Sequence, residues 1–184
     1  MPNTLAHLHA AKALLLVVDL QEKLLPAMYE SEATVAAAAR LMQAMTVLGV
    51  PTIVTEQYPQ GLGTTCPAIR ALMGDARAYA KMLFSACTPE VNGAIDVAWR
   101  GQIIVAGIES HVCVQQTVLD LLRGGREVWV CADATSSRRP LDRDMALDRM
   151  RQAGAVVTTS ESVIFELLRQ AGGEPFKQIL KIVK

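Results

Sequence analysis

Three residues that could perform covalent thiol chemistry each follow an apolar run of the chain. Asp19 closes the run ALLLVVD, Lys81 closes RAYAK, and Cys113 ends the segment GIESHVC that follows QIIVA. A cysteine attacks as its thiolate, and a free thiol with a pKa of about 8.5 is mostly protonated at neutral pH. A helix N-terminus and a lysine ammonium both lower that pKa, while an aspartate can take the proton. Together, the three residues would make a nucleophilic site.

Each of these residues also has a plain structural explanation. An aspartate after a strand is commonly a turn or N-cap residue, a lone lysine is usually a solvated charge, and a buried cysteine packs as a small hydrophobe. The presence of all three residues at the ends of separate runs favours a catalytic role over these structural ones. His111 is a rival base, but it lies two residues from Cys113, and side chains at i and i+2 of a helical turn do not face each other. We therefore expect His111 to line the pocket or the surface.

Alternating strand and helix signals predict the framework that would position these residues. Short apolar runs predict strands at 13–19, 51–55, 77–81, 102–106, 127–131 and 155–158. Helices are expected at 32–48, 89–99, 112–123, 141–153 and 161–171, with a last short helix at 175–183. This alternation indicates a Rossmann-like, three-layer α/β/α fold with a six-stranded parallel sheet in the order 3-2-1-4-5-6. No linker or repeat interrupts the pattern, so we expect one domain over residues 1–184.

The predicted strand order places the three residues at one edge of the sheet. Ligands of open α/β sheets bind beyond the carboxyl ends of the strands, where the strand order reverses. Strands one and four flank that point, so Asp19 and Cys113 would face each other there with Lys81 nearby. The turn between Gly107 and Cys113 could also present backbone N–H groups to an oxyanion.

The composition gives no reason to expect a nucleic-acid or membrane-surface partner. The 184 residues include 18 basic and 18 acidic side chains, so the formal net charge is zero. The same balance permits self-association. The N-terminal stretch lacks a basic region before its short apolar run, which predicts no signal peptide, and no run approaches the ~20 apolar residues of a membrane span. We therefore expect a cytoplasmic protein that acts on a small molecule.

Neither a metal nor a nucleotide cofactor is indicated. The four cysteines form no C-x-x-C pair and have no histidine cluster beside them, which predicts free thiols and no metal site. The segment GLGTT fits neither G-x-G-x-x-G nor the P-loop pattern. Gln21 could orient the base or solvate its loop, and Gln57 and Tyr58 could be pocket walls or loop packing. Asp133 is expected to hydrogen-bond an adjacent loop.

Taken together, these motifs resemble the isochorismatase-like cysteine hydrolases, in particular the isochorismatase domain-containing subgroup. The segments LLLVVDLQ, AKMLFSAC and VAGIESHVCVQQT match the Asp–Lys–Cys triad of that family in order, and the similarity continues through TEQYPQGLGTT, VWVCADATSSR and RMRQAGAVVTTSESVIFELL. The resemblance implies a catalytic triad of Asp19, Lys81 and Cys113, and frequent homo-oligomers. It also implies a cis peptide bond between Ile108 and Glu109, which would turn the Glu109 and Cys113 amides toward an oxyanion.

Two departures narrow the chemistry that the resemblance implies. Nicotinamidases of this superfamily carry an Asp/His metal site after the second strand, but EQYPQGLGTT has no histidine, which argues against a metal and against nicotinamide. True isochorismatases, which hydrolyse a vinyl ether, lack the nucleophilic cysteine, so Cys113 argues for acyl or amide chemistry. We expect a hydrolase that cleaves a small amide-like or acyl substrate through a thioacyl intermediate. The alternative is a catalytically silent, oligomeric binding module that keeps the triad as a relic.

Overall fold

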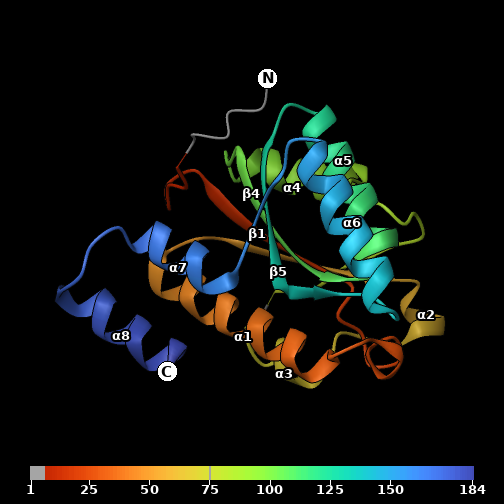
Figure 1. The fold of residues 1–184 in the computed structure, drawn as a ribbon, viewed down its shortest axis with the longest axis horizontal. Coiled ribbons are helices and arrows are strands. Elements are labelled where there is room, and N and C mark those ends of the chain that lie inside the picture. Colours follow the sequence, from red (N-terminus) through yellow and green to blue (C-terminus); the bar gives the residue numbers. More distant parts are fainter. Residues whose placement is uncertain (1–6, 75) are drawn as a thin grey trace.

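A six-stranded parallel sheet forms the centre of the protein (Figure 1). The structure, a computed structural model, describes residues 7–74 and 76–184. The first six residues of the predicted domain, which belong to the stretch expected to lack a signal peptide, lie outside the described residues. The strand order is β3-β2-β1-β4-β5-β6, as predicted, so it reverses between β1 and β4. Within the described ranges, no helix is long and apolar enough to cross a membrane.

Strands and helices alternate along the chain. The strands are β1 (Ala13–Val18), β2 (Thr52–Gln57), β3 (Tyr79–Lys81), β4 (Gln102–Ile108), β5 (Glu127–Ser136) and β6 (Val156–Thr158). The longer helices are α1 (Ser31–Leu48), α4 (Pro89–Val97), α5 (Gln115–Arg123), α6 (Pro140–Gln152), α7 (Ser160–Leu168) and α8 (Gly173–Val183). The short turns are η1 (Leu25–Ala27), α2 (Pro59–Leu62), α3 (Pro67–Arg70) and the π-helical turn η2 (Ser110–Val114).

Helices cover both faces of the sheet, which gives the predicted three layers (Figure 1). Alternate residues of a strand point to opposite faces, so β1 contributes to two cores. Leu15 and Val17 pack in the core that includes α1, α7 and α8, whereas Leu14 and Leu16 pack in the core that includes α4, α5 and α6. Burial of β1 on both faces explains its uninterrupted apolar sequence.

The structure differs from the predicted elements mainly where the chain departs from regular geometry. β5 continues to Ser136, five residues beyond the predicted end, because Thr135 and Ser136 pair with Gly107 and Ile108 after a register shift in β4. The segment expected to be a loop at 56–65 contains the single helical turn α2. Each of these features involves only a few residues, so no hydrophobic period in the sequence can reveal it.

Candidate active site

The ends of β1 and β4 approach each other closely at the edge where the strand order reverses. Gly107 pairs with Val18 and has a φ of +121°. A Cβ atom at Gly107 would lie 2.0 Å from the carbonyl oxygen of Val18, so only glycine fits there. Asp19 directly follows Val18, and the turn that carries Cys113 follows Gly107. The close approach of the two strands therefore brings Asp19 and Cys113 to one place.

Asp19 and Lys81 form a buried ion pair. The Lys81 Nζ atom lies 2.6 Å from Asp19 Oδ2, and both side chains are fully shielded from solvent. The hydroxyl of Thr55 on β2 donates to the other carboxylate oxygen, Oδ1, at 2.8 Å. A buried charge is costly unless it is paired and hydrogen-bonded, and this carboxylate has both kinds of partner.

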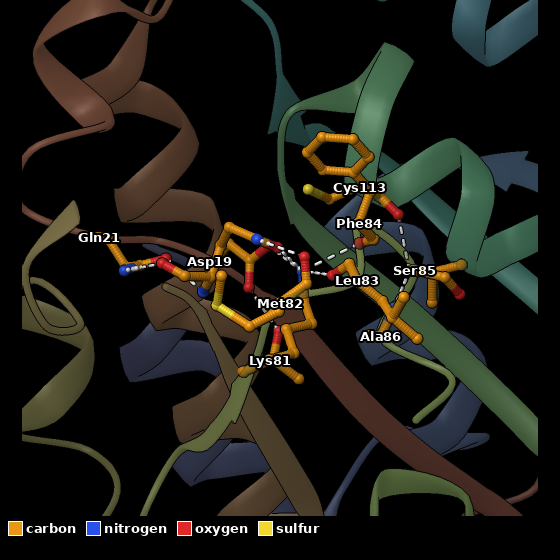
Figure 2. A network of polar contacts seen from close by, with 12 residues as sticks. Asp19, Gln21, Lys81, Met82, Leu83, Phe84, Ser85, Ala86 and Cys113 are labelled. Atoms are coloured by element: carbon orange, nitrogen blue, oxygen red, sulfur yellow. Dashed lines mark hydrogen bonds and ion pairs between the residues drawn. The ribbon is translucent and has the colours of Figure 1, made fainter. Parts of the chain in front are cut away.

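Lys81 also binds three oxygen atoms besides the carboxylate (Figure 2). Its Nζ donates to Gln57 Oε1 at 2.8 Å, to the Phe84 carbonyl at 2.9 Å and to the Leu83 carbonyl at 3.2 Å. An ammonium group has three N–H donors. All of them are therefore engaged inside the protein, and Lys81 can influence the thiol only through its charge.

Cys113 lies in the π-helical turn η2, just before α5. The peptide bond between Ile108 and Glu109 is cis, as the resemblance implied. Asp19 and the backbone N–H of Glu109 both lie near the Cys113 thiol: the carboxylate raises the pKa of the thiol and the N–H lowers it. One of the two amides expected to bind an oxyanion is thus near the reacting atom.

The predicted lowering of the Cys113 pKa is wrong, because the pKa of the thiol is raised to about 12. Burial is the largest cause, and the negative charge of Asp19 adds to it. Lys81 and the Glu109 N–H lower the pKa of the thiol, but by less than burial and Asp19 raise it. Burial also raises the pKa of the Asp19 carboxyl, against the lowering effects of Lys81 and Thr55. The site therefore holds a neutral thiol beside a carboxylate that is a stronger base than an ordinary aspartate.

Gln21 and Gln57, two of the predicted pocket residues, are hydrogen-bonded within the protein. The Gln21 side chain donates to the carbonyls of Gln57 and Gly63 and accepts from the Gln57 N–H at 2.7 Å. The Gln57 side chain accepts from Lys81 and donates to the Met82 carbonyl at 2.9 Å. Both amides therefore position the chain around Lys81.

Tyr58 and His111 lie closer to the surface. The Tyr58 ring packs against Gly61 and is partly exposed, and its backbone N–H donates to the Lys81 carbonyl. His111 Nδ1 lies 3.0 Å from the hydroxyl of Ser137. Asp133 accepts a hydrogen bond from the Ser160 N–H at 2.7 Å, so its partner is the first residue of α7 where the sequence predicted an adjacent loop.

Two further residues around the site were missed by the sequence reasoning. Thr55, near the end of β2, binds Asp19, and Thr117 on α5 donates to the Cys113 carbonyl at 2.6 Å. Thr55 could have been found as a polar residue near the end of an apolar strand, as Asp19 was. Thr117 has no such signal, because a threonine one turn after Cys113 is ordinary in a helix.

Neither a disulfide nor a group of metal ligands is found among the described residues. All four cysteines are free, as predicted. Among residues 7–74 and 76–184, no three His, Cys, Asp or Glu side chains are grouped so that they could hold a metal ion.

Comparison with sequences of known proteins points to one family. The family model described as "Isochorismatase domain" matches residues 13–162. Isochorismatase domain-containing protein 1 of Danio rerio is 39% identical over 183 residues, which cover 99% of this chain and 64% of the relative. Isochorismatase domain-containing protein 2 of Xenopus laevis is 43% identical over 172 residues, covering 93% of this chain and 83% of the relative. The chain thus spans less than two thirds of the first of these relatives.

Solved structures share the fold over most of the chain. MAR1 ribonuclease from Caenorhabditis elegans has a TM-score of 0.92 and 38% identity, covering 97% of this chain and 92% of that one. YcaC from Pseudomonas aeruginosa, solved with hexane-2,5-diol and covalent acrylamide, has a TM-score of 0.89 and 28% identity, with coverage of 97% and 92%. YcaC from Escherichia coli, described as an octameric hydrolase of unknown specificity, has a TM-score of 0.85 and 30% identity, with coverage of 90% and 83%.

Proposed function

Because the chain belongs to the isochorismatase family, we propose that it hydrolyses a small amide-like or acyl substrate through a thioacyl intermediate on Cys113. The proposal rests on one observation above all. A thiol, a carboxyl group and an ammonium group, carried by the ends of three different strands, share one buried site, with 2.6 Å between Lys81 Nζ and Asp19 Oδ2. A nucleophile with an adjacent base oriented by a third group is the arrangement that covalent catalysis needs.

In the first half of the reaction, Asp19 acts as a general base. It takes the proton of the Cys113 thiol while the sulfur attacks the substrate carbonyl, so a free thiolate need not accumulate despite its unfavourable pKa. The raised pKa of Asp19 makes its carboxylate a stronger base than an ordinary aspartate, which acts against the raised pKa of the thiol. The Glu109 and Cys113 amides hold the oxyanion, and Asp19 passes its proton to the leaving amine as the C–N bond breaks.

In the second half, water hydrolyses the thioester. Asp19 takes a proton from water as the oxygen attacks the acyl carbon, and the proton then returns to the sulfur as the C–S bond breaks. Lys81 holds Asp19 in place and favours its return to the carboxylate after each proton transfer, and the free acid leaves. The products are an amine and a carboxylic acid, and the protein returns to its starting state.

The covalent acrylamide in the P. aeruginosa YcaC structure supports the nucleophile of this proposal. Nucleophiles add to the alkene carbon of acrylamide and leave its amide intact, so the adduct supports a reactive group and not the cleavage of an amide. In this chain, Cys113 is the thiol whose pKa is shifted both by a neighbouring Asp19 carboxylate and by the Glu109 N–H. The other three thiols lack this combination among the described residues.

Intact-mass detection of an acyl adduct across a panel of small amides and esters tests the proposal. The reaction is quenched in acid during turnover, and peptide mapping locates the adduct. We expect an adduct on Cys113 that Cys113→Ala abolishes and Cys87→Ala leaves intact. Turnover without any adduct or any dependence on Cys113 would refute the thioacyl mechanism. If no adduct forms and no substrate is turned over, the result would favour the silent binding module.

RNA belongs in the panel because three solved relatives have ribonuclease in their names. RNA binding depends mainly on basic side chains that meet phosphates, and this chain balances 18 basic with 18 acidic residues. A phosphodiester also has no carbonyl carbon for the thiol to attack, so it cannot form a thioacyl intermediate. We therefore expect no RNA cleavage that depends on Cys113, and such cleavage would overturn the assignment to amides and esters.

We also propose that copies of the chain associate into a homo-oligomer. The description of E. coli YcaC as octameric supports this proposal. Light scattering coupled to size-exclusion chromatography gives the mass directly, and a monomer mass at micromolar concentration would contradict it.

A further inference from the structure

The loop between β3 and α4 (residues 82–87) exposes three consecutive large apolar side chains. Met82 is 70% exposed, Leu83 is 62% exposed and Phe84 is 54% exposed. Single exposed apolar residues are common on protein surfaces, but a contiguous group marks a place where something binds. This group directly follows Lys81 in the chain.

The backbone at the start of this loop is held by the site itself. Lys81 Nζ donates to the carbonyls of Leu83 and Phe84, and the Gln57 side chain donates to the carbonyl of Met82. The ammonium that pairs with Asp19 therefore also fixes the path of the loop. With its carbonyls turned inward to these donors, the loop leaves its apolar side chains outside.

The end of the loop is tied to α5, the helix that follows the turn with Cys113. The Ala86 N–H donates to the Thr117 hydroxyl at 2.8 Å, and that hydroxyl donates to the Cys113 carbonyl. Ala86 packs in the same core cluster as Cys113. Figure 2 shows Phe84 and Cys113 at the same end of the polar network. The loop thus runs from the ion pair to the nucleophile.

From these contacts we propose that the β3–α4 loop is an apolar subsite that selects substrates with an uncharged aliphatic or aromatic substituent next to the reacting carbonyl. This inference rests on the proposed function and names its substrate class. The loop carries no charged side chain, and the charges of Asp19 and Lys81 are buried beneath it. A substrate that approaches Cys113 past this loop meets apolar surface, so an apolar substituent gains free energy by leaving water.

A matched pair of chloroacetamides tests the inference. Chloroacetamide and N-benzylchloroacetamide alkylate a thiol in the same way, with the sulfur bonding to the CH₂ carbon, chloride leaving and the thiol proton released. Peptide mass mapping gives the alkylation rate of each cysteine, and each rate is divided by that of glutathione with the same reagent. We expect the benzyl reagent to be favoured at Cys113 by about tenfold, the gain for partial burial of one aromatic ring.

The variant Leu83→Ser/Phe84→Ser should lose most of this preference. Both side chains are exposed, so the fold should tolerate the change. Val97→Ser/Trp99→Ser is the matched control, because these residues are 80% and 91% exposed at the end of α4 and have no contact with the loop's hydrogen-bond network. The control should keep the full preference.

The outcomes separate this inference from the function on which it rests. If Cys113 reacts no faster with chloroacetamide than Cys87 does, the proposed function fails. If Cys113 is reactive but shows no benzyl preference, or the loop variant keeps that preference, only the apolar subsite is refuted. If the loop variant lowers the oligomer mass in light scattering while the control does not, the loop is a contact between copies and the subsite is likewise refuted.

Discussion

Replacing Lys81 with methionine is the most direct test of the buried ion pair. Methionine has a similar length without the charge, so the change leaves Asp19 as a carboxylate in a fully buried position. Removing one partner of a buried pair typically costs about 3–5 kcal/mol, because the remaining charge has lost both water and its counter-ion. The hydrogen bonds from Lys81 to Gln57 and to the β3–α4 loop are lost as well. We therefore expect Lys81→Met to lie at the upper end of this range at pH 8.

The loss of unfolding free energy caused by Lys81→Met should increase as the pH rises. Burial raises the pKa of Asp19 and Lys81 lowers it, so the pKa in Lys81→Met rises further. A carboxyl group with a higher pKa in the folded than in the unfolded state contributes stability below its unfolded pKa and loses it as pH rises through the folded value. The destabilisation should therefore be smaller near pH 5, where mainly the Lys81 hydrogen bonds are lost, and grow toward about pH 8, since buried carboxyls can titrate that high.

Urea unfolding from pH 5 to pH 8 measures this dependence. Asp19→Asn provides the control, because an amide needs no counter-ion, and Asp19→Asn/Lys81→Met should be more stable at pH 8 than Lys81→Met alone. If Lys81→Met lowers the unfolding free energy by less than about 1 kcal/mol at pH 8, the pair is no stronger than a surface salt bridge, and the reasoning is refuted. A loss that is equal at pH 5 and pH 8 would refute its electrostatic origin.

Two further predictions follow from the backbone contact and from the thiol. Gly107→Ala should cost at least about 3 kcal/mol in urea unfolding, because its Cβ would meet the Val18 carbonyl, whereas Gly93→Ala in α4, where nothing lies within 4 Å, should be neutral or stabilising; equal effects would contradict the close approach. A thiol with a folded pKa of about 12 and an unfolded pKa of about 8.5 contributes stability that is lost as pH rises between those values, at about 1.4 kcal/mol per pH unit. Cys113→Ala should therefore flatten the decline in unfolding free energy between pH 9 and pH 11, and a slope equal to that of the wild type would contradict the raised pKa.

Sequence periodicity was enough to predict the sheet because parallel strands buried on both faces are uninterrupted apolar runs. Ala13–Val18 and residues 103–108 have that pattern, and in the structure they lie side by side. The irregular features were not predictable in this way. The register shift in β4 and the π-helical turn at Ser110–Val114 follow from contacts made by a few residues, and they decide how the thiol is presented.

The sequence by itself determined which chemical groups gather at the sheet edge. Asp19, Lys81 and Cys113 follow the carboxyl ends of three strands, and in a parallel sheet those ends share one edge. Only the tertiary structure decided how these groups behave. Burial of the thiol and the neighbouring charge of Asp19 raise the pKa of Cys113, and Lys81, which pairs with Asp19 and holds the β3–α4 loop, lowers it by less. The physical reason is that burial and charge separation set a pKa, and both depend on where side chains lie in space and not on their spacing along the chain.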